Sequence, residues 1–255
     1  MNDYDPQWYD LYFNGVEGDV EFYLDEAVDG QGPTLEIGCG TGRILIPLAR
    51  DAGVPVTGLD ISKPLINVAL DKLKREPDLV QHRSNIVEGD MRNFDLGETF
   101  ATVLLPYRTF QHLLTPVDQL SALKEIRRHL EKDGRLVFNA FEPTDEIQRD
   151  GWSTPLRLDT ELFDRSKDEM VSVYFCRLCH PQTQLMEQSF IFERWDNCGK
   201  SKGRYIQNLS LRWSTEWEMR HLFNLAGFSV IACYGDFEGN PYPGFGEQIW
   251  VLEVE

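Results

Sequence analysis

The chain has 255 residues, which is enough for one large α/β domain whose core needs no disulfide or metal support. It carries 42 acidic and 25 basic residues, for a formal net charge of -17. This charge repels nucleic acid phosphates and anionic membrane surfaces, so we expect neither nucleic acid nor membrane as a partner.

The predicted elements begin near residue 34, where short β-branched runs alternate with longer helical patterns. This alternation is typical of βαβ units and of a parallel sheet. One helix is expected after Asp60, with Ser62 as its cap, and another from Thr115-Pro116 to Asp133-Gly134. The expected strands lie at 34–38, 55–60, 84–89, 100–105 and 134–140.

Residues 151–213 change to a period of two, with turn-rich linkers between the runs, which predicts an inserted antiparallel sheet. The helical period returns at 215, where Thr215 and Glu218 have capping-box spacing and Gly227 suits a left-handed stop. Two final strands are expected near 228–234 and 247–254.

A glycine-rich turn follows the first strand in "TLEIGCGTGRILIPLA", residues 34–49. Such a turn brings a ligand against bare backbone at a helix N-terminus. Its spacing is G-x-G-x-G, from Gly38 to Gly42, and Arg43 stands where the dinucleotide fingerprint requires its last glycine. No Gly-Lys-Ser/Thr of the triphosphate-binding type occurs either. The turn therefore fits neither the dinucleotide fingerprint nor a triphosphate-binding loop.

"LEIGCGTGRILIPLA" followed by "VTGLDIS" resembles the first two motifs of class I S-adenosylmethionine-dependent methyltransferases. "VEGDMRNF", "ATVLLPYRTFQHL" and "HLEKDGRLVFNAF" are similar to the family's later strand ends, and "YDPQWYDLY" is similar to the lid helix of its small-molecule members. The resemblance implies a Rossmann-like, doubly wound sheet with strand order 3-2-1-4-5-7-6, the last strand antiparallel. A methyltransferase domain would then comprise 1–150 and 214–255, with lid helices in 1–30 and an inserted acceptor lid in 151–213.

The resemblance also implies site roles. Asp60 would accept the ribose hydroxyls, Glu36 would support the methionine end, and Asp90 with Met91 would meet the adenine. Tyr9, or less closely Tyr12, would place an aromatic hydroxyl at the cofactor. The full implied set for S-adenosylmethionine, or the product S-adenosylhomocysteine, is Tyr9, Tyr12, Glu36, Gly38, Cys39, Gly40, Gly42, Arg43, Asp60, Ile61, Gly89, Asp90, Met91 and Leu105.

Methyl transfer from a sulfonium requires alignment and exclusion of water, and a base only when the acceptor must lose a proton. His112 is the candidate base, with Tyr107 and Arg108 as positioning groups, although a histidine bonded only to backbone is an equal interpretation. Four residues of the inserted sheet are candidate acceptor contacts or outward-facing strand residues: Arg177, His180, Arg212 and Trp213. The cysteines and His180 of "CRLCH" lack a second Cys-x-x-Cys, so we expect no metal.

We therefore expect an enzyme that methylates N, O or C of a small molecule. Two alternatives stay open: a non-catalytic sensor or partner subunit that binds S-adenosylmethionine, and a nicotinamide-linked oxidoreductase, which Arg43 disfavours. Homodimerisation through exposed strand edges is a further expectation. Five scattered cysteines and an N-terminus without a basic start or apolar core indicate a cytoplasmic protein.

Overall fold

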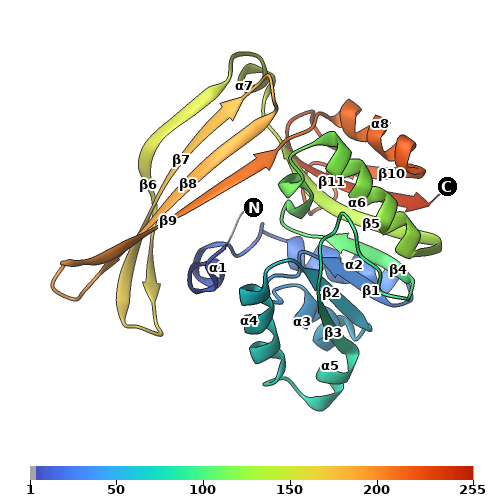
Figure 1. Cartoon of the computed structure of the whole chain (residues 1–255), viewed down its shortest axis with the longest axis horizontal. Helices are drawn as coiled ribbons and strands as arrows, with labels where there is room; N and C mark the ends of the chain where they lie inside the picture. Colours follow the sequence, from blue (N-terminus) through green and yellow to red (C-terminus); the bar gives the residue numbers. More distant parts are fainter. Residues whose placement is uncertain (1–3, 255) are drawn as a thin grey trace.

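The computed structural model describes residues 4–254, which form a seven-stranded sheet and a separate four-stranded sheet (Figure 1). The larger sheet has the order β10-β11-β5-β4-β1-β2-β3. Its strands are β1 (Thr34–Ile37), β2 (Val56–Asp60), β3 (Ser84–Glu88), β4 (Phe100–Leu105), β5 (Leu130–Glu142), β10 (Phe228–Tyr234) and β11 (Gly246–Val254).

The observed order is the predicted 3-2-1-4-5-7-6, because β10 and β11 are the sixth and seventh strands of this sheet along the chain. Strands β1 to β5 pair in parallel, whereas β11 is antiparallel to both β5 and β10. The carboxyl ends of β1, β2 and β4 therefore meet at one edge. In an open α/β sheet that edge is where ligands bind.

Helices cover both faces of this sheet (Figure 1). On one face, α6 and α8 bury Leu123, Ile126 and Phe223 against strand residues such as Val103 and Phe138. On the other, α2 and the segment after the glycine turn cover Leu104 and Val137. The helices and helical turns are α1 (Pro6–Tyr12), α2 (Asp19–Asp29), α3 (Leu45–Pro47), the π-helical turn η1 (Leu48–Ala52), α4 (Lys63–Leu73), α5 (Asp78–Arg83), the 3-10 turn η2 (Thr109–His112), α6 (Pro116–His129), α7 (Asp145–Asp150) and α8 (Glu216–Ala226).

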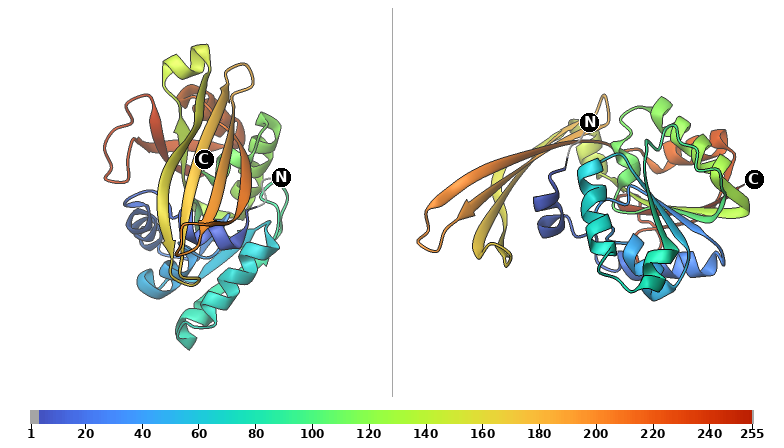
Figure 2. Two further views of the ribbon diagram at one scale, coloured as in Figure 1. Left: turned by 90° about the vertical axis from the view of Figure 1, so that its left-hand side faces the viewer. Right: turned by 60° about the horizontal axis from the view of Figure 1, so that its bottom comes forward.

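The four-stranded sheet is antiparallel, as predicted, with the order β6-β7-β8-β9. It projects from the larger sheet in Figure 1 and in the right-hand view of Figure 2, with α1 lying between the two parts. Trp8 stacks on Phe192 with ring centroids 4.9 Å apart, and Asp10 on the same helix pairs with Lys72 of α4 at 2.7 Å. The strands of the four-stranded sheet are β6 (Trp152–Asp164), β7 (Glu169–His180), β8 (Leu185–Trp195) and β9 (Ser201–Arg212).

The helix caps are confirmed in part. Thr115 caps α6 through the Asp118 N–H, and Thr215 with Glu218 forms the complete capping box of α8, which ends at Gly227 with φ +81°. By contrast, the Ser62 hydroxyl accepts no backbone hydrogen bond at the start of α4, whereas the N–H of Ser62 itself donates to the carboxylate of Asp60.

The predicted end of α6 was wrong. The helix ends at His129, and Leu130 already pairs with Phe100 as the first residue of β5. Asp133 does turn the chain, with φ +66°, but inside an irregular stretch of β5. Leu130 continues the helical spacing of Leu123 and Ile126, but its pairing with Phe100 in the sheet overrides that spacing.

All five cysteines are free thiols. Across residues 4–254, no helix combines the length and the apolar character needed to cross a lipid bilayer.

Candidate active site

The glycine turn is approached closely from two sides. Gly38, Gly40 and Gly42 all have positive φ, which glycine adopts without strain. A Cβ atom on Gly38 would lie 2.5 Å from Cγ2 of Thr109, and one on Gly40 would lie 3.2 Å from the hydroxyl of Tyr9. The turn therefore has little room for side chains, since η2 and α1 both pack against its backbone.

Asp60 lies at the carboxyl end of β2, beside this turn, and is only 9% exposed. Its Oδ2 accepts the N–H of Gly40 at 2.8 Å, and its Oδ1 accepts the N–H of Ser62 at 2.7 Å. Burial raises the pKa of this carboxyl, while the backbone N–H groups oppose the rise. A carboxylate offers about four acceptor positions, so about two remain for hydroxyl donors of a ligand.

A cavity of about 540 Å³ opens in front of Asp60. Three acids, Asp60, Asp90 and Asp118, line it together with apolar side chains such as Leu59 and Leu65. We call it the cofactor cavity. It brings together seven of the predicted cofactor residues: Tyr9, Gly38, Asp60, Ile61, Gly89, Asp90 and Met91.

Three other members of the predicted cofactor set are buried behind this cavity. Cys39 and Leu105 are almost fully buried, and so is Glu36, whose Oε2 has no hydrogen-bond partner within residues 4–254. Burial raises the pKa of Glu36 well above its usual value, although Arg43 lowers it.

The remaining members lie around the turn or outside it. Arg43 forms a bidentate pair with Asp19 of α2, at 2.8 and 2.7 Å. Gly40 and Gly42 shape the turn itself, and Gly42 faces Ile46 and Ala69. Tyr12 lies in a second, adjacent cavity.

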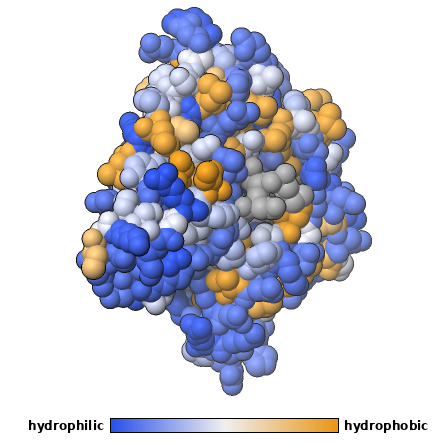
Figure 3. All heavy atoms as spheres, turned by 60° about the vertical axis from the view of Figure 1, so that its left-hand side comes forward, coloured by the Kyte–Doolittle hydropathy of each residue, from blue (hydrophilic) through white to orange (hydrophobic). Residues whose placement is uncertain are grey.

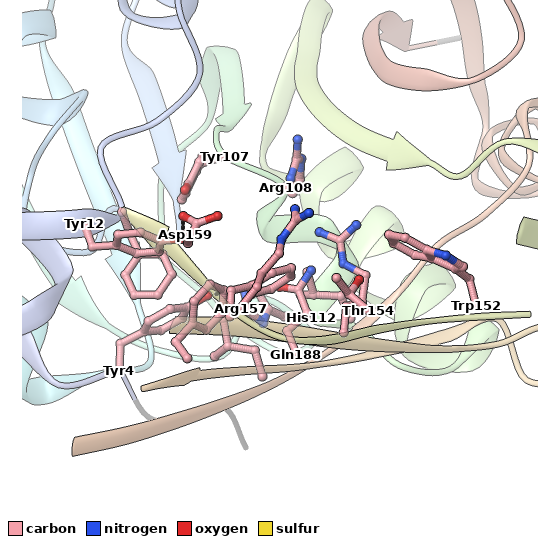
Figure 4. A pocket seen from close by; sticks show the side chains of 16 residues that line it. Tyr4, Tyr12, Tyr107, Arg108, His112, Trp152, Thr154, Arg157, Asp159 and Gln188 are labelled. Carbon is pink, nitrogen blue, oxygen red and sulfur yellow. Dashed lines mark hydrogen bonds between the residues drawn. The ribbon is translucent and has the colours of Figure 1, made fainter. Parts of the chain in front are cut away.

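The second cavity has a volume of about 470 Å³ and is drawn in Figure 4. We call it the acceptor cavity. Ten of its sixteen lining residues belong to the four-stranded sheet, whereas the cofactor cavity takes Ser210 alone of that sheet's described residues. Tyr4, Tyr107 and His112 line both cavities and form the wall between them.

Tyr107 and Arg108 follow β4 with φ +55° and +62°, both in the left-handed region. Non-glycine residues in this region cost of order 1–3 kcal/mol each, so the surrounding contacts must hold them there. The Arg108 guanidinium donates from Nε to Oε1 of Glu247 at 2.8 Å, and its backbone N–H donates to Asn139 at 3.2 Å. This strained pair directs one ring into the wall and one guanidinium into the acceptor cavity.

His112 ends η2 with its Nε2 3.3 Å from the hydroxyl of Tyr4. Burial lowers its pKa to about 4, so the ring is neutral at neutral pH and a weak base. Burial also raises the pKa of Tyr107 and that of Tyr4. The wall between the cavities therefore carries no charge at neutral pH.

Apart from Arg108, the charged groups of the acceptor cavity lie on the four-stranded sheet. Asp159 accepts a hydrogen bond of 2.8 Å from the hydroxyl of Tyr12. Arg157, on the same strand, and Arg177 on β7 line the same cavity (Figure 4). Arg177 also lies over the rings of Phe175 and Phe141, at 5.2 and 5.8 Å from their centroids.

Of the four sheet residues considered from sequence, Arg177 alone lines the acceptor cavity. Arg212 is buried in a network with Ser214 at 2.6 Å and Glu218 at 3.2 Å, which ties β9 to α8. Trp213 is 1% exposed, and His180 lies beside Glu187 at 3.5 Å.

Sequence reasoning missed Tyr4, Arg157 and Asp159. Along β6 the lining residues change parity from Trp152 and Thr154 to Arg157 and Asp159, and the strand register shifts between Thr154 and Arg157. A β-bulge of this kind re-aims the residues that follow it. The sequence does show that Arg157 and Asp159 are two positions apart and so share a face of the strand. It does not show the bulge, which is what brings them to the same face as Thr154.

Within the part of the chain that the structure describes, no group of three or more His, Cys, Asp or Glu side chains is placed to hold a metal ion.

Residues 34–134 match a family model described as a methyltransferase domain. The chain is 26% identical over 235 residues to a cypemycin N-terminal methyltransferase of Streptomyces sp, covering 88% of this chain and 83% of that protein.

Two solved structures share the fold. The CcbJ methyltransferase from Streptomyces caelestis superposes with a TM-score of 0.76 at 23% identity, covering 93% of this chain and 89% of that one. An amino pentose methyltransferase from Micromonospora echinaspora, involved in calicheamicin biosynthesis and solved with S-adenosylmethionine bound, gives 0.69 at 22% identity, covering 100% and 99%.

Proposed function

Since this chain is a class I S-adenosylmethionine-dependent methyltransferase, we propose that it methylates an amine of a small-molecule acceptor held against the four-stranded sheet. The cofactor supplies a methyl group that the positive charge of its sulfonium makes electrophilic. The residues of this chain would hold the two reactants in adjoining cavities that share Tyr4, Tyr107 and His112, so that the acceptor atom can meet the methyl group beside these side chains.

The cofactor cavity fits this cofactor by its chemistry. Its three acids outnumber its one arginine, Arg92, which pairs with Asp90 and Asp118, so the cavity suits a cationic ligand without phosphates. Asp60, which has no cationic partner among the ion pairs of the described residues, keeps free acceptor positions for two ribose hydroxyls. Glu36, buried with an unpaired Oε2, is a candidate acceptor for the ammonium of the methionine part.

We propose an amine as the acceptor because the side chains of the wall carry no charge and include no effective base. A hydroxyl acceptor must lose its proton as it is methylated, which calls for a base with a pKa near neutral. His112, with a pKa of about 4, is poorly suited to that role, and the raised pKa values of Tyr4 and Tyr107 keep both phenols protonated. A neutral amine brings its own lone pair. Its nitrogen attacks the methyl carbon, the S–CH₃ bond breaks, and the new ammonium later releases its proton to water.

The relatives narrow the class of amine. One is named for a peptide N-terminus and another for an amino pentose. An acceptor cavity of about 470 Å³ accommodates one sugar ring or one terminal residue with its neighbour. We therefore propose a primary or secondary amine on an amino sugar or on a peptide end.

The test is a panel of amino sugars and short peptides, each paired with an analogue in which a hydroxyl or an acetylated nitrogen replaces the amine. Release of S-adenosylhomocysteine and a mass gain of one methyl group are the readouts. We expect turnover of the free amines and no turnover of the hydroxyl or acetylated analogues. Methylation of the hydroxyl analogues in place of the amines would overturn the proposal.

The acceptor cavity also bears on the sensor alternative. A protein that only senses the cofactor needs no second cavity beyond the wall, whereas here Arg157, Asp159 and Arg177 line one. Binding of S-adenosylhomocysteine without turnover of any amine would favour the sensor.

The remaining proposals concern partners and setting. The net charge of -17 and the free thiols support a cytoplasmic protein without nucleic acid partners. Hydrophobic side chains gather in patches on the face seen in Figure 3, and exposed apolar residues of the edge strands include Leu156 and Leu158 on β6 and Ile206 on β9. These edges support a homodimer. Light scattering of the purified chain distinguishes monomer from dimer.

A further inference from the structure

We propose that the acceptor carries an anionic group, a carboxylate or a phosphate, which Arg157 and Arg177 bind at the sheet side of the acceptor cavity. This inference rests on the proposed function, because it names the acceptor's second recognition element. It assigns Arg157 and Arg177 as specificity-determining residues.

The cavity has more cations than its acids neutralise. Three guanidiniums line it, those of Arg108, Arg157 and Arg177. Arg108 is neutralised by Glu247, which itself is held by Asn139 at 3.0 Å. No carboxylate pairs with either Arg157 or Arg177 within residues 4–254. In a chain with 42 acidic and 25 basic residues, two guanidiniums without acids in one cavity form a local excess of positive charge.

Arg177 is held in place by neutral groups. With its oxygen facing the guanidinium, the amide of Gln188 accepts from Nε at 3.0 Å and from Nη2 at 2.9 Å. The rings of Phe175 and Phe141 also contact this guanidinium. These partners orient the guanidinium without cancelling its charge. A partly buried charge without a counter-charge is costly, so the site gains most from a ligand that supplies an anion.

The arginines also reinforce each other's field. Burial lowers the pKa of Arg177, and the guanidiniums of Arg108 and Arg157 lower it further, which places the three cations within electrostatic range. Guanidiniums bind carboxylate and phosphate oxygens in a bidentate manner.

The one carboxylate of the cavity lies apart from this cluster. Asp159 accepts a hydrogen bond from Tyr12, and in Figure 4 the Arg157 guanidinium is directed away from the Asp159 carboxylate toward Arg108. The cavity therefore has an acidic end at Asp159, which suits an amine, and a basic end at Arg157 and Arg177, which suits an anion. An acceptor with both groups matches both ends.

The test measures binding of two probes, inorganic pyrophosphate and malonate, to the chain saturated with S-adenosylhomocysteine, by calorimetry at low ionic strength. The variants are Arg157→Gln, Arg177→Gln and their double. Arg165→Gln is the matched control, because Arg165 is an exposed arginine of the β6–β7 turn outside both cavities.

We expect at least one probe to bind, and the double variant to weaken that binding about tenfold or more, as loss of hydrogen bonds to a charged group predicts. Arg165→Gln should bind as the unmodified chain does. Preference for pyrophosphate assigns a phosphate acceptor, and preference for malonate assigns a carboxylate. Equal binding by the chain and the double variant, or none up to about 10 mM, overturns the inference. If S-adenosylhomocysteine itself fails to bind, the proposed function fails instead.

Discussion

Replacement of Asp60 by alanine tests the cofactor cavity at its central residue. The carboxylate holds the N–H groups of Gly40 and Ser62 and keeps about two acceptor positions for ligand hydroxyls. Hydrogen bonds to a charged group contribute about 1.5–3 kcal/mol each, so two lost bonds amount to about 3–6 kcal/mol. We expect S-adenosylhomocysteine to bind Asp60→Ala about 10² to 10⁴ times more weakly.

Calorimetric titration with S-adenosylhomocysteine measures this loss, and a parallel thermal unfolding run shows whether the variant folds. The backbone bonds to Gly40 and Ser62 are also lost, which should lower Tm by about 2–4 °C per kcal/mol. Asp71→Ala removes an exposed acid of α4 and serves as the control. A folded Asp60→Ala variant that binds within about threefold of the unmodified chain, a change of under 1 kcal/mol, would refute the role of this carboxylate.

Three further predictions address the wall, the sheet junction and the turn. The pKa of His112 is about 4 in the folded chain against 6.5 unfolded, so the unfolded state takes up the proton first and stability falls as pH drops from 6.5 to 4. The free energy of unfolding, measured with urea at pH 6.5 and at pH 4, should therefore fall by about 3 kcal/mol less in His112→Gln than in the unmodified chain. An equal fall in both would argue against a neutral, buried His112 ring. Arg212→Met removes a buried guanidinium and leaves its neutral partners Gln119 and Ser214 without their hydrogen bonds, whereas its charged partner Glu218 is 42% exposed. We therefore expect a loss of about 1–3 kcal/mol in urea unfolding while S-adenosylhomocysteine still binds. Gly38→Ala should weaken cofactor binding and lower Tm, because its Cβ would meet Thr109 at 2.5 Å and φ is +74°; unchanged values for both would show that the turn can relax.

The larger sheet was predictable because its signals are local. Each strand is a short apolar run bounded by turn residues, and the caps at Thr115 and Thr215 act within one helical turn. The glycine turn and Asp60 are likewise separated by one βαβ half-unit, so their meeting follows from the parallel topology.

The acceptor cavity was less predictable because its residues meet only through long-range packing. Tyr4 reaches His112 across 108 positions, and Tyr12 reaches Asp159 across 147. The bulge before Arg157 has no marker in the residue types around it. Arg212 was expected to be either an acceptor contact or an outward-facing strand residue, whereas its contacts with the start of α8 hold it in the interior.

The division of labour between the two sheets has an evolutionary consequence. Because the four-stranded sheet supplies ten of the sixteen residues around the acceptor and a single described residue around the cofactor, mutations in its hairpins can alter which molecule is modified while the donor stays bound as before. Exchange of these hairpins between homologous enzymes is thus a direct route to new acceptor selectivity, provided that the aromatic contacts of α1 with Phe190 and Phe192 are transferred with them.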